Sequence, residues 1–151
     1  MKMRTLKARE VEQAPHLLWN SFVDLLAMER YEDLTEAQRP AHLVFWYESE
    51  VYNGGHLQYF ENRRTKYLEE TIAALRLLRA ECQRSVLQDA IEQFRNRDRE
   101  RIETPQDYSE IALQGEFDQF DSRLSACDPD LMKRLEEYFS LHQSSFVIIV
   151  S

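Results

Sequence analysis

The feature that most restricts this chain is a pair of adjacent glycines, Gly54 and Gly55, directly after Asn53. The sequence contains only three glycines, so two of them are used at one point. Glycine and asparagine both tolerate the left-handed backbone that ends a helix. Apolar residues on more than one stripe predict a central, largely buried helix from about Arg39 to Tyr52, and a short helix follows from His56. The triplet therefore predicts a tight helix-Asn-Gly-Gly-helix corner.

Glycine and proline are scarce throughout, at three and four residues of 151. This scarcity argues against an all-β fold, whose many turns need both residue types. Apolar residues instead recur at helical spacing over about residues 11–30, 65–82, 86–96 and 129–142, with one or two shorter helices between residues 108 and 124. A chain of this length is the size of one domain. We therefore expect an all-α fold, a single compact multi-helix domain over residues 1–151.

Two residue pairs have the spacing of a capping box, in which two side chains each bond the other's backbone amide at a helix start. Thr35 and Gln38 have this spacing before the helix that begins near Arg39. Ser85 and Gln88 have it at the start of the helix expected over residues 86–96. The nearly all-polar stretch that continues to Thr104 predicts an exposed loop.

The two cysteines, Cys82 and Cys127, lack the spacing of a metal or redox site. We interpret both as buried thiols in a reducing cytoplasm. The first eleven residues contain no apolar segment of a signal peptide. The apolar run from Phe146 to Val150 is far shorter than the roughly 20 residues of a transmembrane helix, and it predicts a tail or a short strand. We expect a cytoplasmic protein without a membrane span.

Charge is distributed unevenly along the chain, whose formal net charge is -8. Residues 1–97 contain 15 acids and 14 bases, whereas residues 98–151 contain 12 acids and 5 bases. A nucleic-acid phosphate backbone requires a basic surface, so we expect no direct binding of nucleic acid. The late acidic segment instead favours a basic protein as partner.

Six acids of this segment form the candidate binding surface: Glu103, Asp107, Glu110, Glu116, Asp118 and Asp121. The first three are four and three positions apart, which places them on one face if the stretch is helical, about 5 to 6 Å from one another. Phosphates along a DNA strand are separated by a distance of the same order. These acids could therefore present a DNA-like charge pattern to a basic protein. A solvated helix face explains the same residues without a partner.

Polar side chains around the corner form an alternative site, consisting of Asn53, His56, Gln58, Tyr59 and Asn62. These groups could line a small polar pocket for a small molecule or a peptide. Amides near helix ends also commonly satisfy exposed backbone groups, which leaves a structural role open. The carboxylates of Glu48 and Glu50 point in different directions on a helix, so we interpret them as surface charges.

No motif in the chain indicates a particular reaction. The four histidines lack metal-ligand spacing, and neither a nucleophile elbow nor a phosphate-binding glycine loop is present. We therefore predict no metal, no cofactor and no catalytic residue.

Residues 50–62 read EVYNGGHLQYFEN, and this run resembles the E-V-x-N-G-G-x-x-Q-Y-F-x-N signature of a bacterial domain family of unknown function that includes a DNA mimic protein. The resemblance extends more loosely to residues 34–39 and 117–146. It implies an all-α fold. For the DNA-mimic member, it also implies binding to a helix-turn-helix transcription factor in place of DNA.

Three functional hypotheses result. The first is a non-enzymatic interaction protein whose acidic C-terminal third binds a basic protein, such as a DNA-binding regulator. The second is a small-molecule or peptide binder, or an enzyme, that uses the polar groups beside the corner. The third is an oligomerisation module, such as a homodimer, in which residues 145–150 add as a strand to a neighbouring chain.

Overall fold

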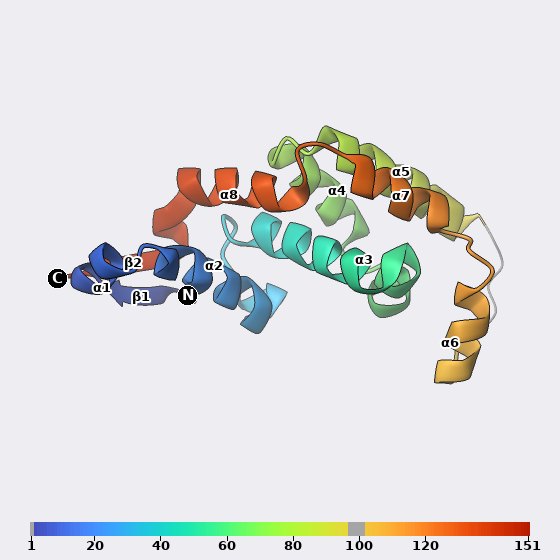
Figure 1. Cartoon of the computed structure of the whole chain (residues 1–151), viewed down its shortest axis with the longest axis horizontal. Coiled ribbons are helices and arrows are strands. Elements are labelled where there is room, and N and C mark those ends of the chain that lie inside the picture. The colour runs from blue at the N-terminus through green and yellow to red at the C-terminus, as the bar shows by residue number, and fades with distance from the viewer. Residues whose placement is uncertain (1, 97–101) are drawn as a thin grey trace.

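The computed structural model describes residues 2–96 and 102–151, which are mainly helical (Figure 1). These described residues form eight α-helices, two short 3-10 turns and one two-stranded sheet. The elements are β1 (Arg4–Lys7), α1 (Ala8–Gln13), α2 (His16–Met28), α3 (Arg39–Arg63), α4 (Leu68–Leu77), α5 (Glu81–Arg95), α6 (Pro105–Ala112), α7 (Asp118–Ala126), α8 (Leu131–His142) and β2 (Val147–Val150). The predicted all-α class is confirmed, with the small sheet as an addition. No helix in the described part of the chain is long and apolar enough to cross a membrane.

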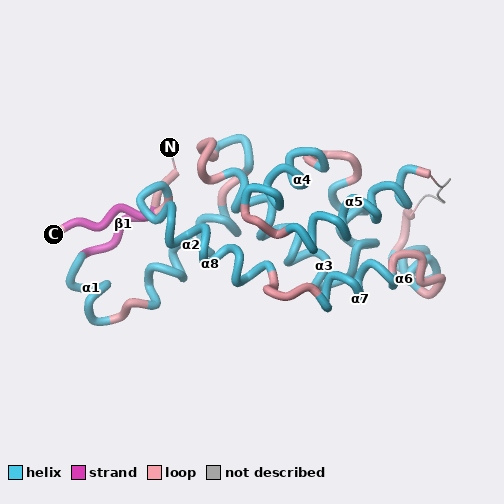
Figure 2. The backbone as a smooth tube through the Cα atoms, turned by 90° about the horizontal axis from the view of Figure 1, so that it is seen from above, coloured by secondary structure: helices cyan, strands magenta, loops and turns pink. Residues whose placement is uncertain are grey.

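The long helix α3 is the centre of the fold and packs against α2, α4, α7 and α8. Its side chains Ala41, Val44 and Tyr47 are completely buried, as the apolar residues on several of its faces predict. Seen from above, α3 runs through the middle of the molecule, with α2 and α8 toward one end and α5 and α7 toward the other (Figure 2). The elements around α3 therefore determine what can line a site beside it.

The start of α3 is fixed by the predicted capping box. The Thr35 amide donates to Gln38 Oε1 at 3.0 Å, and the Gln38 amide donates to Thr35 Oγ1 at 3.3 Å. The buried Gln38 side-chain amide also donates to the carbonyl oxygens of Lys2 and Ser145, at 2.6 and 2.8 Å. One side chain thus caps α3 and holds segments from both ends of the chain.

The second predicted capping box is wrong. Helix α5 begins at Glu81, so Ser85 and Gln88 both lie inside it. The reason is the short reversal after α4, where Arg79 adopts a left-handed conformation with φ of 62°. The helix expected over residues 11–30 is likewise divided at Ala14, whose backbone is not helical, directly before Pro15.

The predicted corner is present within α3. Gly54 and Gly55 depart from helical geometry, and Gly55 has φ of 72°, a conformation that favours glycine. A Cβ atom on Gly55 would lie 2.5 Å from Asp121 Oδ2, and one on Gly54 would overlap the Gln58 side chain. Both positions therefore require glycine because other side chains approach the backbone closely.

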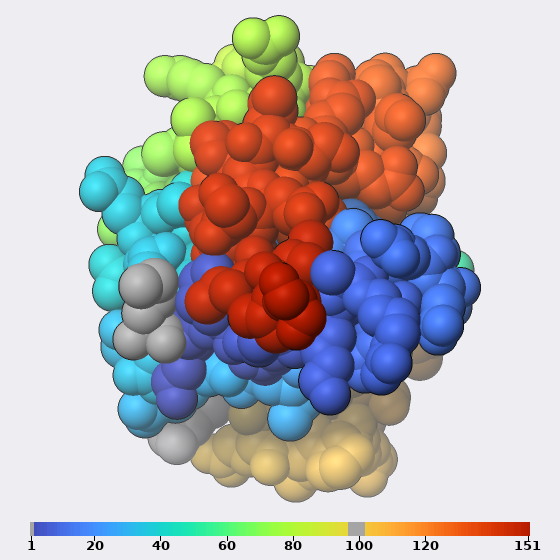
Figure 3. All heavy atoms as spheres, turned by 90° about the vertical axis from the view of Figure 1, so that its left-hand side faces the viewer, coloured from blue at the N-terminus to red at the C-terminus, as the bar shows by residue number. Residues whose placement is uncertain are grey.

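The C-terminal apolar run forms strand β2, which pairs in parallel with β1 of the same chain. The register places Arg4 opposite Val147 and Lys7 opposite Val150. Figure 3 shows this C-terminal segment in red lying among the blue N-terminal residues. The strand interpretation of the run is confirmed, and the strand that pairs with it here is β1 rather than a neighbouring chain.

The interpretation of the cysteines as free thiols is wrong, because Cys82 and Cys127 form a disulfide. Cys82 lies in the first turn of α5, and Cys127 directly follows α7. These two helices pack against each other, which brings the cysteines together across 45 positions of sequence. The expected cytoplasmic location rested partly on free thiols, and it remains a prediction.

Candidate functional site

The first three candidate acids do not share one helix face. Helix α6 begins at Pro105 after its N-cap Thr104, so Glu103 precedes the helix. The Asp107 carboxylate accepts hydrogen bonds from the backbone amides of Glu103 and Thr104, at 3.2 and 3.3 Å. Asp107 therefore caps the helix, while Glu103 and Glu110 are exposed.

The other three candidate acids lie at the start of α7 and just before it. Glu116 accepts a 3.4 Å hydrogen bond from the Gln93 side chain, and Asp118 is exposed. Asp118 and Asp121 are in the first turn of α7, where negative charge interacts favourably with the helix dipole. We refer to the exposed members of the six, Glu103, Glu110 and Asp118, as the acidic surface.

Asp121 turns inward and binds the corner of α3. Its Oδ1 accepts a 2.8 Å hydrogen bond from the His56 backbone amide and lies 2.6 Å from His56 Nδ1. On the other side of the ring, His56 Nε2 lies 2.8 Å from the Tyr47 hydroxyl. A carboxylate only accepts hydrogen bonds, so Nδ1 is the donor to Asp121. Both ring nitrogens of His56 are therefore bonded to side chains of the same chain.

This chain of bonds lies in the core. The His56 and Tyr47 side chains are completely buried, and Tyr59 is nearly so. Burial, with smaller contributions from nearby Tyr59 and Asp121, raises the pKa of Tyr47 well above its usual value. Burial also raises the pKa of Tyr59 to about 12. Two of the five residues proposed for the alternative pocket, His56 and Tyr59, are thus part of the interior.

The other three residues of the alternative pocket, Asn53, Gln58 and Asn62, form an amide cluster with Glu50. Gln58 and Asn62 both donate to Glu50 Oε2 at 2.7 Å, and Asn53 donates to Gln58 Oε1 at 3.0 Å. These bonds connect the helical turns on the two sides of the corner. The cluster holds the corner in place, which gives the amide side chains around the two glycines a structural role.

A small cavity of about 60 Å³ lies beside the corner. Gly54, Leu57, Asp118 and Asp121 are among its lining residues, whereas the amides of the cluster are not. Ligand pockets usually measure roughly 300 to 1,000 Å³. This cavity is therefore too small for an organic ligand or a peptide.

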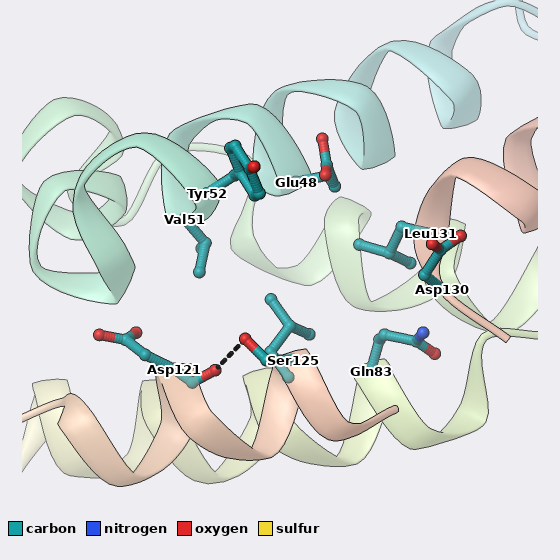
Figure 4. A pocket seen from close by; sticks show the side chains of 9 residues that line it. Glu48, Val51, Tyr52, Gln83, Asp121, Ser125, Asp130 and Leu131 are labelled. Carbon is teal, nitrogen blue, oxygen red and sulfur yellow. Dashed lines mark hydrogen bonds between the residues drawn. The ribbon is translucent and has the colours of Figure 1, made fainter. Parts of the chain in front are cut away.

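A larger groove of about 430 Å³ lies between α3 and α7 (Figure 4). Its lining residues are Glu48, Val51 and Tyr52 of α3, Gln83 of α5, Asp121, Leu124 and Ser125 of α7, and Asp130 and Leu131 at the start of α8. The buried Gln83 side chain donates to the Pro129 carbonyl at 2.7 Å, which fastens the segment before α8 to α5. Asp130 Oδ1 accepts from the Lys133 amide at 2.9 Å and caps α8. The end of the groove nearest α8 is thus held in place by specific bonds.

The groove is acidic, since three carboxylates and no Lys or Arg side chain line it. Burial raises the pKa of Glu48, and the nearby charge of Asp130 raises it further. The sequence interpretation of Glu48 as an ordinary surface charge missed this arrangement. Among the described residues, we find no group of three His, Cys, Asp or Glu side chains that could hold a metal ion.

Comparison with known proteins gives one match. A family model described as DMP19-like protein matches residues 32–142. This range includes the corner, both cysteines and every residue that lines the groove. No curated protein and no solved structure matches the chain.

Proposed function

Because the chain belongs to the DMP19-like protein family, we propose that it is a non-enzymatic protein-interaction module that binds a basic DNA-binding protein in place of DNA. The matched range contains residues 50–62, so this is the DNA-mimic family that those residues resemble. The acidic surface of Glu103, Glu110 and Asp118 is the part that contacts the partner. Asp107, Glu116 and Asp121 contribute negative charge nearby while also bonding to groups of the chain itself.

The observation that supports this proposal is the pairing of the bases in residues 98–151. Arg123 pairs with Asp89 at 2.9 Å, Lys133 with Glu136 at 3.9 Å and Arg134 with Glu137 at 3.2 Å. All bases of this segment that the structure describes are therefore in ion pairs within the chain. The segment contains 12 acids and only 5 bases, so its net charge is -7. Such a surface attracts a basic partner and repels nucleic acid.

The interior of the molecule supports an interaction role over a catalytic one. His56 is the histidine closest in sequence to the corner, yet it is buried with both ring nitrogens bonded to side chains of the chain. A general acid or base must come within hydrogen-bond reach of its substrate. The Asp121–His56–Tyr47 chain of bonds therefore stabilises the corner.

Affinity capture from the native host, followed by competition with duplex DNA, tests this function. The immobilised chain should retain a basic DNA-binding protein, which duplex DNA releases. Retention should also fall as salt rises from about 0.05 to 0.5 M, because salt screens exposed charges. A partner that neither duplex DNA nor salt releases would contradict the proposal.

Two triple variants make the comparison specific. Glu103→Gln, Glu110→Gln and Asp118→Asn together remove the acidic surface and should abolish retention. Glu12→Gln, Glu36→Gln and Glu70→Gln together remove the same amount of charge from exposed positions in other parts of the chain. This control should retain the partner. Equal losses in the two variants would mean that overall charge, and not the acidic surface, is responsible.

Binding of a small molecule or a peptide is the second candidate function. The groove between α3 and α7 supports this candidate better than the amide cluster does, because its volume of about 430 Å³ lies within the range of ligand pockets. The chemistry of its lining indicates which ligand it would accept.

A further inference from the structure

We propose that the groove between α3 and α7 receives an arginine side chain presented by the basic partner. This inference rests on the proposed function and deepens it, because it assigns the contact to a specific receptor with a defined side-chain chemistry. The groove is separate from the acidic surface, because none of Glu103, Glu110 and Asp118 lines it.

The shape of the groove combines apolar walls with carboxylates. Val51 on α3 points across the groove toward α7, and Asp130 lies at the end nearest α8 (Figure 4). Leu124 and Leu131 add further apolar lining. Arginine buries its aliphatic stem against apolar surface while its charged head remains at a polar end. The apolar walls therefore fit the stem, and the carboxylates fit the head.

The charge of the groove favours a cation as its ligand. Glu48 is half-buried, and within the described part of the chain it accepts no hydrogen bond and forms no ion pair. Burial raises the pKa of Glu48, and the charge of another carboxylate, that of Asp130, raises it further. An opposite charge beside a carboxylate stabilises its ionised form. A bound cation would thus remove an unfavourable feature that the chain leaves uncompensated.

Two features favour arginine over lysine. Tyr52 is 88% exposed although it lines the groove, so its ring face is available to a planar cation. A guanidinium group stacks on aromatic faces and bonds carboxylates through a planar fork of donors, whereas an ammonium group is more strongly hydrated. The volume of about 430 Å³ also leaves room for the residues that flank the arginine in a peptide.

A titration observed by NMR tests the inference without the native partner. The probe is the capped peptide acetyl-Gly-Arg-Gly-amide, added to the isotope-labelled full chain. Saturable shifts should appear at the amides of Val51, Tyr52, Leu124 and Ser125. The matched lysine peptide should bind more weakly by a measurable factor, and the uncharged citrulline peptide should not bind.

Two variants and one control assign the site. Glu48→Gln should weaken the arginine peptide roughly tenfold, because a hydrogen bond between charged groups is lost. Tyr52→Ala changes an exposed side chain, so it tests the aromatic contact even if the Glu48 variant is unstable. Glu70→Gln, on α4, is the control and should leave the affinity unchanged.

The outcomes separate this inference from the proposed function. Shifts confined to α6 and the first turn of α7, with unchanged affinity in the Glu48 and Tyr52 variants, would contradict arginine binding in the groove. They would leave the proposed role of the acidic surface standing. Absence of any saturable shift would also contradict arginine binding in the groove. Binding of the arginine peptide in the groove, combined with a captured partner that DNA does not release, would support the groove and contradict DNA mimicry.

Discussion

Asp121 on α7 accepts a 2.8 Å hydrogen bond from the backbone amide of His56, the first residue after the Asn53-Gly54-Gly55 corner of α3. The two residues are 65 positions apart, so an acid of the late segment closes the corner of the central helix. A side chain on Gly55 would place a Cβ atom 2.5 Å from Asp121 Oδ2. The glycine pair and the acidic segment are therefore parts of one contact.

Replacing Gly55 with alanine should destabilise the protein by about 2 to 4 kcal/mol, because the positive φ strains any L-residue and the new methyl group meets Asp121. Urea unfolding measures this change. The same substitution in an Asp121→Ala background should have a smaller effect, since the clash is then absent. Equal effects in both backgrounds would show that the approach of Asp121 does not restrict this position.

The stability of the protein should depend on His42 in mildly acidic solution. Burial lowers the pKa of His42 to about 4, with a further contribution from the positive charge of Arg63. The unfolded chain, with an ordinary histidine pKa near 6.5, then binds more protons than the folded chain between about pH 4 and 6.5. The free energy of unfolding should therefore fall as the pH decreases through this window, by roughly 3 kcal/mol for His42 alone.

NMR titration of the His42 ring tests this directly, and it should show a neutral ring at pH 5. The variant His42→Gln should lose the corresponding part of the pH dependence relative to the unsubstituted protein. A ring that titrates near pH 6.5 in the folded state would contradict the expected effect of burial.

Breaking the Cys82–Cys127 disulfide should lower the unfolding free energy, because the bond closes a loop across a sequence separation of 45 residues. The chain-entropy relation gives about 4 kcal/mol for a loop of this length. Unfolding with and without a reductant measures the difference. The Cys82→Ser variant should be insensitive to reductant, and an unsubstituted protein equally insensitive to it would argue that the bond is absent.

Deleting residues 147–151 should destabilise the chain, since this removes β2, the partner of β1, and the buried Val147 side chain. The oligomeric state in solution should stay the same, because the strand pairs within its own chain. Light scattering and thermal unfolding measure both quantities, with deletion of Ser151 alone as control. Conversion of a dimer to a monomer on deletion would instead support strand addition between two copies.

Local patterns predicted the helices and the corner well, because both depend on residues close in sequence. The spacing of Thr35 and Gln38 identified the start of α3, and the adjacent glycines identified its corner. The same kind of pattern failed at Ser85, because a left-handed Arg79 let the next helix begin earlier. Local spacing cannot reveal the tertiary packing that decides such cases.

The contacts that define the candidate sites join residues far apart in sequence. Glu48 and Asp130 line the same groove although more than 80 positions separate them, and nothing in the neighbouring residues of either one indicates the other. The disulfide could not be predicted for the same reason, because only the packing of α5 against α7 brings Cys82 and Cys127 together. The sequence also does not indicate that the Asp121 side chain points inward to His56.

The most direct test of the central claim is a competition between this chain and labelled duplex DNA for the captured basic partner, followed by fluorescence anisotropy. Adding the chain should release the DNA and lower the anisotropy to that of free duplex. The variant without Glu103, Glu110 and Asp118 carboxylates should leave the DNA bound at the same concentrations. Simultaneous binding of the chain and DNA to the partner, seen as a higher anisotropy, would contradict the claim that this protein takes the place of DNA.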